Sequence, residues 1–117
     1  MSQPLRLMRA LKDWTWMNVM STFIYVVKLV KSKMFEKMSS EEEAVVEDHF
    51  DRLRKALAEG KLILAGPCLD GEFGIVVFRA QSGEEAEKFM KNDPAVKKGI
   101  MTAELHPFRV SLIEKTK

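Results

Sequence analysis

Few side chains in this sequence ordinarily change charge close to neutral pH, because it contains only two histidines, His49 and His106. A histidine changes charge close to neutral pH, so its neutral imidazole can act as a general base. Apolar residues repeat around His49 at helical steps: Val46, Phe50, Leu53 and Leu57. At about 100° per residue, His49 lies about 60–70° from the centre of this stripe. From there it can face a cleft between helix and sheet, or bond to the backbone, Asp48 or Asp51 as an ordinary helix histidine.

Cys68 is the single cysteine, so the chain can form no intrachain disulfide, CxxC motif or cysteine zinc site. A reducing, cytoplasmic location is expected, and no second motif would activate the thiol as a nucleophile. His49, Asp93 and His106 are suitable metal ligands by type, but their spacing matches no metal motif. His106 precedes Pro107 and is interpreted as structural. We therefore predict no metal and no cofactor.

Two proline dipeptides mark further candidate positions. Gly66-Pro67 follows an apolar run, and a glycine there would let a ligand approach the backbone closely, although simple turn chemistry is the favoured explanation. Asp93 precedes Pro94, and an aspartate in that place commonly caps a turn or short helix. A capping role for Asp93 is compatible with a role in a site.

Composition indicates one globular domain without a membrane span. Of 117 residues, 46% are hydrophobic and 31% are charged, with a net charge of +2. The basic residues are spread along the chain, which argues against a nucleic-acid surface. Asn18 and Lys28 interrupt the apolar stretch at residues 14–30, which therefore lacks the run of about 18 residues that a span needs. A secretory signal is not expected either.

Boundary signals divide most of the chain into helices and strands. Ser39 and Ser40 each precede a glutamate by three residues, so either can open a helix that Gly60 ends. Ser82 opens a second helix in the same way, and Asp70-Gly71 predicts a tight turn. Strands are expected at residues 22–30, 61–69, 73–80 and 101–113, helices at 39–60 and 82–90, and a short turn or helix at 93–99.

The order β-α-β-β-α-β predicts an α+β fold of the ferredoxin-like kind, with a four-stranded antiparallel sheet and two helices on one face. Residues 21–117 would form this single domain. Residues 1–20 precede it as an N-terminal extension with Leu7, Leu11 and Trp14 at helical spacing. The extension is either an amphipathic helix packed on the domain or a partner, or a start-site extension ahead of Met20.

The predicted strands are apolar at nearly every position, as in Phe23 to Val27, Leu62 to Ala65 and Ile75 to Phe78. A sheet with one wet face should instead alternate apolar and polar residues. Two helices cover only one face, so something else must cover the other. We expect a homodimer that packs sheet to sheet, with the N-terminal extension as the alternative cover.

Several of these pieces together resemble the YciI-like family, also called the YCII-related domain. They are His49 in the first helix, Gly60, a strand ending in Ala65-Gly66-Pro67, then Asp93-Pro94, Gly99 and Pro107-Phe108. The resemblance covers about residues 22–110. It implies a dimeric α+β barrel and a site in which His49 and Asp93 face each other. The segment after Ala65-Gly66-Pro67 is shorter than is common in the family, which implies a more open or differently gated pocket.

The resemblance also implies a reaction class, because family members with an assigned reaction act on small ring compounds. We expect a cofactor-independent isomerase or lyase in which His49 and Asp93 are catalytic and Gly66 and Pro67 bind the substrate. The alternative is a non-catalytic module of the same fold that binds a small ligand or a protein partner. Neither hypothesis involves nucleic acid or a membrane.

Overall fold

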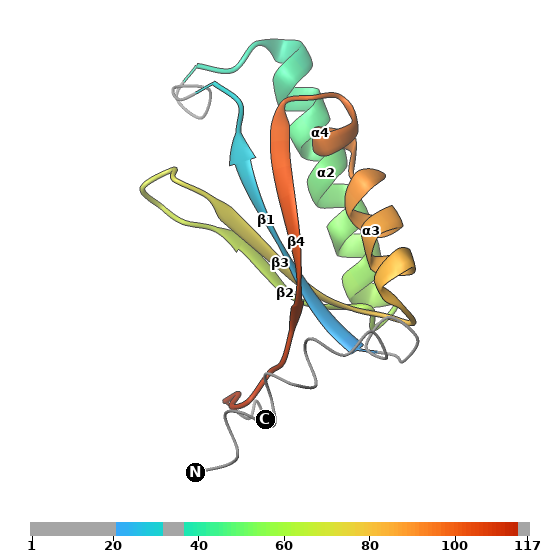
Figure 1. Ribbon diagram of the computed structural model, residues 1–117. Coiled ribbons are helices and arrows are strands. Elements are labelled where there is room, and N and C mark those ends of the chain that lie inside the picture. The colour runs from blue at the N-terminus through green and yellow to red at the C-terminus, as the bar shows by residue number, and fades with distance from the viewer. Residues whose placement is uncertain (1–20, 32–36, 115–117) are drawn as a thin grey trace.

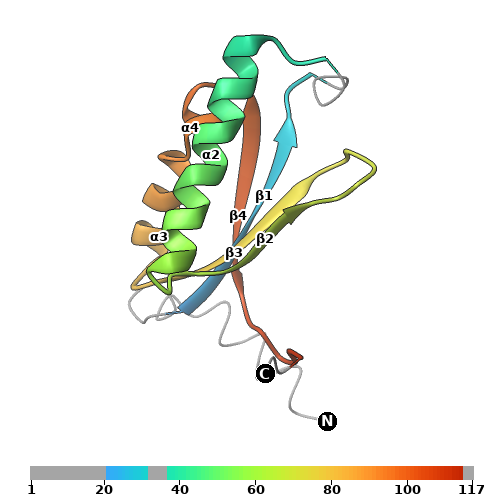
Figure 2. The same cartoon turned by 180° about the vertical axis from the view of Figure 1, so that it is seen from behind.

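The computed structural model describes residues 21–31 and 37–114. Four strands form one antiparallel sheet in the order β2-β3-β1-β4: β1 (Ser21–Leu29), β2 (Leu62–Pro67), β3 (Gly74–Ala80) and β4 (Met101–Phe108). Three helices, α2 (Ser40–Ala58), α3 (Gly83–Lys91) and α4 (Pro94–Lys97), cover one face of the sheet (Figure 1, Figure 2). The ferredoxin-like α+β fold is confirmed, while the predicted N-terminal extension lies outside the described residues.

Helix α2 begins and ends at local signals in the sequence. The Ser39 side chain accepts a hydrogen bond from the Glu42 backbone N–H, and the Glu42 carboxylate accepts one from the Ser39 N–H. This complete capping box fixes the start that the sequence left open between two serines. Gly60 has φ 78° after the last turn, and the next residue's N–H, on Lys61, bonds to the carbonyl of Ala56. That pattern is a Schellman ending, which favours glycine.

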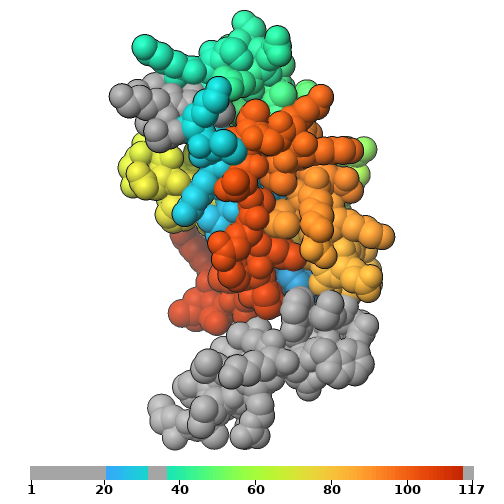
Figure 3. All heavy atoms as spheres, turned by 45° about the horizontal axis from the view of Figure 1, so that its top comes forward, coloured from blue at the N-terminus to red at the C-terminus, as the bar shows by residue number. Residues whose placement is uncertain are grey.

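The last strand is shorter than predicted. It was expected to continue to residue 113, but β4 ends at Phe108, whose partner is Thr22 at the start of β1. Beyond that pair, only Ser21 remains of β1, so β4 has almost no neighbouring strand left to bond to. Pro107 lies within β4 opposite Phe23, and the edge position removes the need for its missing N–H (Figure 3 shows β4 at the surface beside α3).

The core lies between the sheet and the helices. Phe23, Tyr25 and Val27 of β1 point toward the helices and are buried, as are Phe78 of β3 and Phe89 of α3. The opposite face of the sheet carries apolar side chains on β1, β2 and β3: Ile24, Val26, Leu64, Ile75 and Val77. On β4, the same face carries the polar side chains of Thr102, Glu104 and His106. In the described residues, no helix or loop layer covers this second face.

Candidate active site

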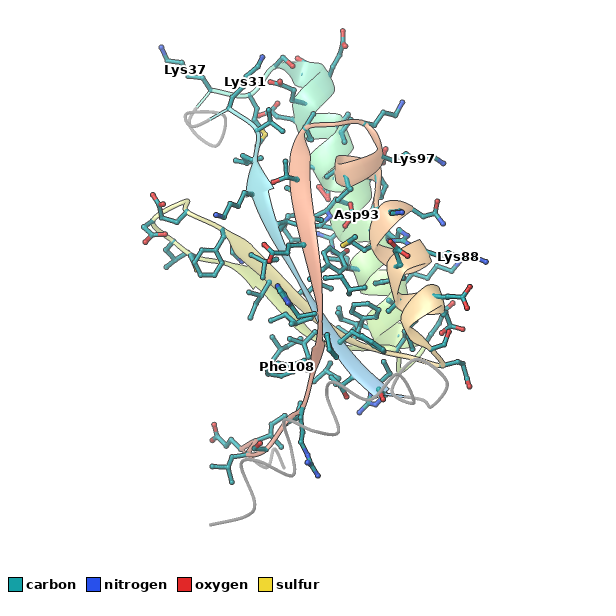
Figure 4. The ribbon with its side chains drawn as sticks, in the orientation of Figure 1. Lys31, Lys37, Lys88, Asp93, Lys97 and Phe108 are labelled. Atoms are coloured by element: carbon teal, nitrogen blue, oxygen red, sulfur yellow. The ribbon has the colours of Figure 1, made fainter. Side chains whose placement is uncertain are left out.

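Asp93 lies at the turn between α3 and α4 and is completely buried. It is the N-cap of α4, and its Oδ1 accepts a hydrogen bond of 2.9 Å from the Ala95 backbone N–H. Pro94 occupies the first turn, where a missing N–H costs nothing. Figure 4 shows Asp93 pointing inward from this layer, while Lys88 and Lys97 point away from it. The cap therefore aims a carboxylate into the interior.

His49 meets that carboxylate from the middle of α2. Its Nδ1 lies 2.8 Å from Oδ1 and 2.7 Å from Oδ2 of Asp93, and the residue is only 3% exposed. Of the alternative partners, Asp51 bonds instead to Arg54 on the exposed side of the helix. The two residues thus face each other as the resemblance implied, and Asp93 serves as cap and as histidine partner at once.

Tyr25 is a third member of this cluster that the sequence analysis missed. Its hydroxyl donates a hydrogen bond of 2.6 Å to Oδ2 of Asp93. Tyr25 comes from β1, so the sheet, α2 and α4 each supply one residue to the cluster. A signal was present in the sequence: Tyr25 carries the one polar group in the apolar segment Phe23 to Val27. A buried tyrosine hydroxyl usually requires a partner.

The cluster keeps Asp93 ionised and Tyr25 protonated. Burial alone raises the pKa of Asp93, but the hydrogen bonds from His49, Tyr25 and the Ala95 N–H outweigh it and hold this pKa below its ordinary value. Burial and then the Asp93 charge raise the pKa of Tyr25 well above its ordinary value. An ionised carboxylate only accepts hydrogen bonds, so Nδ1 of His49 must carry a proton and donate it. In the neutral imidazole, Nε2 is then the basic nitrogen.

A pocket of about 290 Å³ adjoins His49 between α2 and the β2–β3 hairpin. Val46 and Phe50 of α2 line it on one side, and Gly66, Pro67 and Cys68 line it on the other. Among the described residues of its wall, His49 and Cys68 have the only polar side chains, and none is a lysine, arginine, aspartate or glutamate. A ligand in this pocket would therefore contact apolar groups, one imidazole and one thiol.

A model of the YCII-related domain matches residues 22–109 of the chain. The chain belongs to the YCII-related domain family. Among solved structures, it is similar to 5-chloro-2-hydroxyhydroquinone dehydrochlorinase from Burkholderia phenoliruptrix AC1100, in complex with 2,5-dihydroxybenzoquinone. The TM-score is 0.60 at 19% sequence identity, over 75% of this chain and 93% of that one, which supports a shared fold. No curated protein matches the chain.

The remaining candidate residues of this YCII-related domain fall in different places. Gly66 and Pro67 line the pocket, as a ligand-binding role requires. His106 is exposed on the opposite face of the sheet, where its Nε2 lies 2.8 Å from a Glu104 oxygen. It therefore cannot join His49 and Asp93 in a metal site. Among the described residues, no three His, Cys, Asp or Glu side chains are grouped to hold a metal ion, and no described helix is long and apolar enough to cross a membrane.

Proposed function

We propose that this YCII-related domain is an acid/base enzyme that isomerises a small cyclic organic compound or eliminates a leaving group from it. One observation carries the proposal: a buried imidazole borders an apolar pocket while its Nδ1 is held 2.7 Å from a buried carboxylate. This arrangement orients His49 and leaves Nε2 as the base. His49 and Asp93 are the proposed catalytic residues, and Gly66 and Pro67 are proposed to contact the substrate.

The chemistry would begin with proton abstraction by Nε2 of His49 at a carbon or hydroxyl next to a carbonyl. The Asp93 carboxylate would stabilise the imidazolium that forms. In an isomerisation, the electron pair shifts along the substrate and the same imidazolium returns the proton to another atom. In an elimination, the pair expels the leaving group as an anion. Both reactions use a single base, which agrees with the apolar character of the remaining pocket wall.

The pocket also suggests the kind of substrate. Its volume of about 290 Å³ is at the lower end for ligand sites, which favours a compound of one or two rings. Without a charged side chain on the described wall, a carboxylate or phosphate would be buried unpaired at a high cost. The structural neighbour acts on a chlorinated hydroxyhydroquinone, so this compound is the first substrate to test.

The test is chloride release from 5-chloro-2-hydroxyhydroquinone, measured without oxygen because hydroquinones oxidise in air. We expect His49→Gln to lower the rate at least about 100-fold, since a glutamine can bond to Asp93 but cannot act as a base. His106→Gln, which changes the exposed histidine on the other sheet face, should retain full activity. Equal activity of His49→Gln and the wild type would refute the proposal. Binding of 2,5-dihydroxybenzoquinone with no turnover of any ring substrate would favour the non-catalytic binding module.

We further propose that the open face of the sheet packs against a second copy of the chain. Apolar side chains from three strands meet on this face, and Leu64 is 45% exposed there. Burying such a face removes apolar area from water, and a second identical face is the simplest complement. The free thiol of Cys68 fits a reducing, cytoplasmic setting, which fractionation of the source cells would test.

A further inference from the structure

Tyr25 has the one side chain with a polar group among the described residues of the hydrophobic core, and this group lies beside the buried polar pair His49 and Asp93. We infer that Tyr25 is a positioning residue of the site, whose hydroxyl holds the Asp93 carboxylate so that His49 keeps its proton on Nδ1 and presents Nε2 to the pocket. The use of Nε2 as a base rests on the function proposed above. The positioning itself can be measured without any activity.

The geometry gives both oxygens of the carboxylate fixed hydrogen-bond donors. Oδ2 receives the Tyr25 hydroxyl at 2.6 Å and Nδ1 of His49 at 2.7 Å. Oδ1 receives the Ala95 N–H at 2.9 Å and also lies 2.8 Å from Nδ1. Without the hydroxyl, the carboxylate would be held on the Oδ2 side by the imidazole alone. Tyr25 therefore supplies the second point that prevents the carboxylate from rotating about the cap.

The hydroxyl also determines which partner carries the proton. A tyrosine buried at 0% exposure remains protonated and must donate. The ionised Asp93 accepts from Tyr25 and from Ala95 and has no hydrogen to donate, so its remaining partner, His49, must hold its proton on Nδ1. Removing the hydroxyl removes one of the bonds that hold the pKa of Asp93 low against burial. The carboxylate would then take up a proton from water more readily, and as an acid it would donate to Nδ1 of His49, which would leave the histidine proton on Nε2.

Packing alone does not account for a tyrosine at this position. The ring contacts Phe78 and Phe89 edge to face, at centroid distances of 5.7 and 6.2 Å. A phenylalanine would make the same ring contacts without burying a hydroxyl. A purely structural role, in which the bond only ties β1 to α4, remains the competing interpretation. It predicts a loss of stability in Tyr25→Phe without a change in the tautomer of His49.

The experiment is nitrogen-15 NMR of the histidine side chains in the full-length protein. The chain has only two histidines, so His106, on the opposite face of the sheet, is an internal reference. In the wild type, we expect His49 to be protonated on Nδ1 in its neutral form. In Tyr25→Phe, we expect its two nitrogen shifts to move toward each other as the tautomers mix, while the His106 shifts stay unchanged. Phe23→Leu, a core change in the same strand and on the same face, should leave both histidines unchanged.

A second perturbation uses the fact that Tyr25 is the only tyrosine in the sequence. Growth on 3-fluorotyrosine would label this position alone, and fluorine makes the phenol a stronger donor while retaining the fold. We expect the pH at which Asp93 takes up a proton, followed by its carboxyl carbon-13 shift, to fall in the fluorinated protein and to rise in Tyr25→Phe. General destabilisation cannot produce shifts of opposite sign.

The outcomes separate the two proposals. Unchanged His49 nitrogen shifts in Tyr25→Phe, or Asp93 shifts of the same sign in both proteins, would overturn the positioning role whatever the activity. If the positioning holds and the protein turns over a ring substrate, Tyr25→Phe should lower kcat about 10- to 100-fold with little change in KM. If His49→Gln has no effect on turnover, the proposed function fails while the Tyr25 result stands.

Discussion

Nδ1 of His49 lies 2.7 Å from Oδ2 of Asp93, although the two residues are 44 positions apart in the chain. Both are essentially removed from water, at 3% and 0% exposure. A charged hydrogen bond in such surroundings is stronger than one at the surface, and a partner left alone there is costly. The contact therefore links the stability of the fold to the protonation of the site.

We expect acid to weaken the fold through Asp93. Its pKa in the folded protein lies below the ordinary value of about 4. The ionised carboxylate therefore stabilises the folded state at pH values above about 4, and this contribution is lost as the pH falls through the folded pKa. Asp93→Asn should lower the free energy of unfolding by about 2–3 kcal/mol at pH 7 and flatten its decline toward pH 3, measured by urea denaturation.

Asp51→Asn is the control for this experiment. Asp51 forms an exposed ion pair with Arg54, which contributes little in water. The change should alter stability by less than about 0.5 kcal/mol. If Asp93→Asn kept the acid dependence of the wild type, the carboxylate would not be the group that titrates.

Two glycines of the pocket wall should respond to alanine in opposite ways. A Cβ on Gly66 would meet no atom within 4 Å, whereas one on Gly74 would lie 3.3 Å from the Gly66 carbonyl oxygen and from a Val27 methyl group. Gly66→Ala should leave stability unchanged or raise it by about 0.4–1 kcal/mol. Gly74→Ala should lower it by about 1–3 kcal/mol.

Ligand binding should show a separate effect at Gly66. If the ligand approaches this backbone, Gly66→Ala will weaken binding of 2,5-dihydroxybenzoquinone, measured by calorimetry, even though the protein is as stable as the wild type. Unchanged affinity would mean that Gly66 and Pro67 serve only the turn.

Two leucines of similar exposure provide a matched test of the proposed homodimer. Leu64 lies on the open sheet face at 45% exposure, and Leu57 lies on α2 in the helical layer at 56%. Leu64→Lys would bury a charge between two sheets and should convert the dimer into monomers, as measured by light scattering coupled to size exclusion. Leu57→Lys should remain dimeric. A monomeric wild type would exclude this arrangement.

Cys68 should report when the pocket is occupied. It is the single cysteine of the chain and part of the pocket wall. Its alkylation by iodoacetamide, followed by intact mass, should slow at least several-fold when 2,5-dihydroxybenzoquinone is bound. The protein unfolded in urea should react at the same rate with and without the compound, which controls for direct reaction between the two reagents. An unaltered rate in the folded protein would place the ligand elsewhere.

Local chemistry made most of the fold predictable. Capping serines, Gly60 and Pro94 act on residues within one helical turn, so their effects can be recognised from short segments. The order of strands and helices then restricts the topology to a few arrangements. The end of β4 could not be predicted in this way, because Phe108 is the last residue of β4 that pairs with β1, and this depends on the register between two strands far apart in the sequence.

The sequence by itself determined the approximate boundaries of the helices and the residue types available for chemistry. Only the tertiary structure decided which of them meet. Tyr25 is 68 residues from Asp93, and its partner follows from the packing of β1 against the helical layer. His106 was placed on the other face of the sheet by the register of β4. Side-chain encounters over such separations depend on how whole elements pack, and the spacing of residues along the chain does not contain that information.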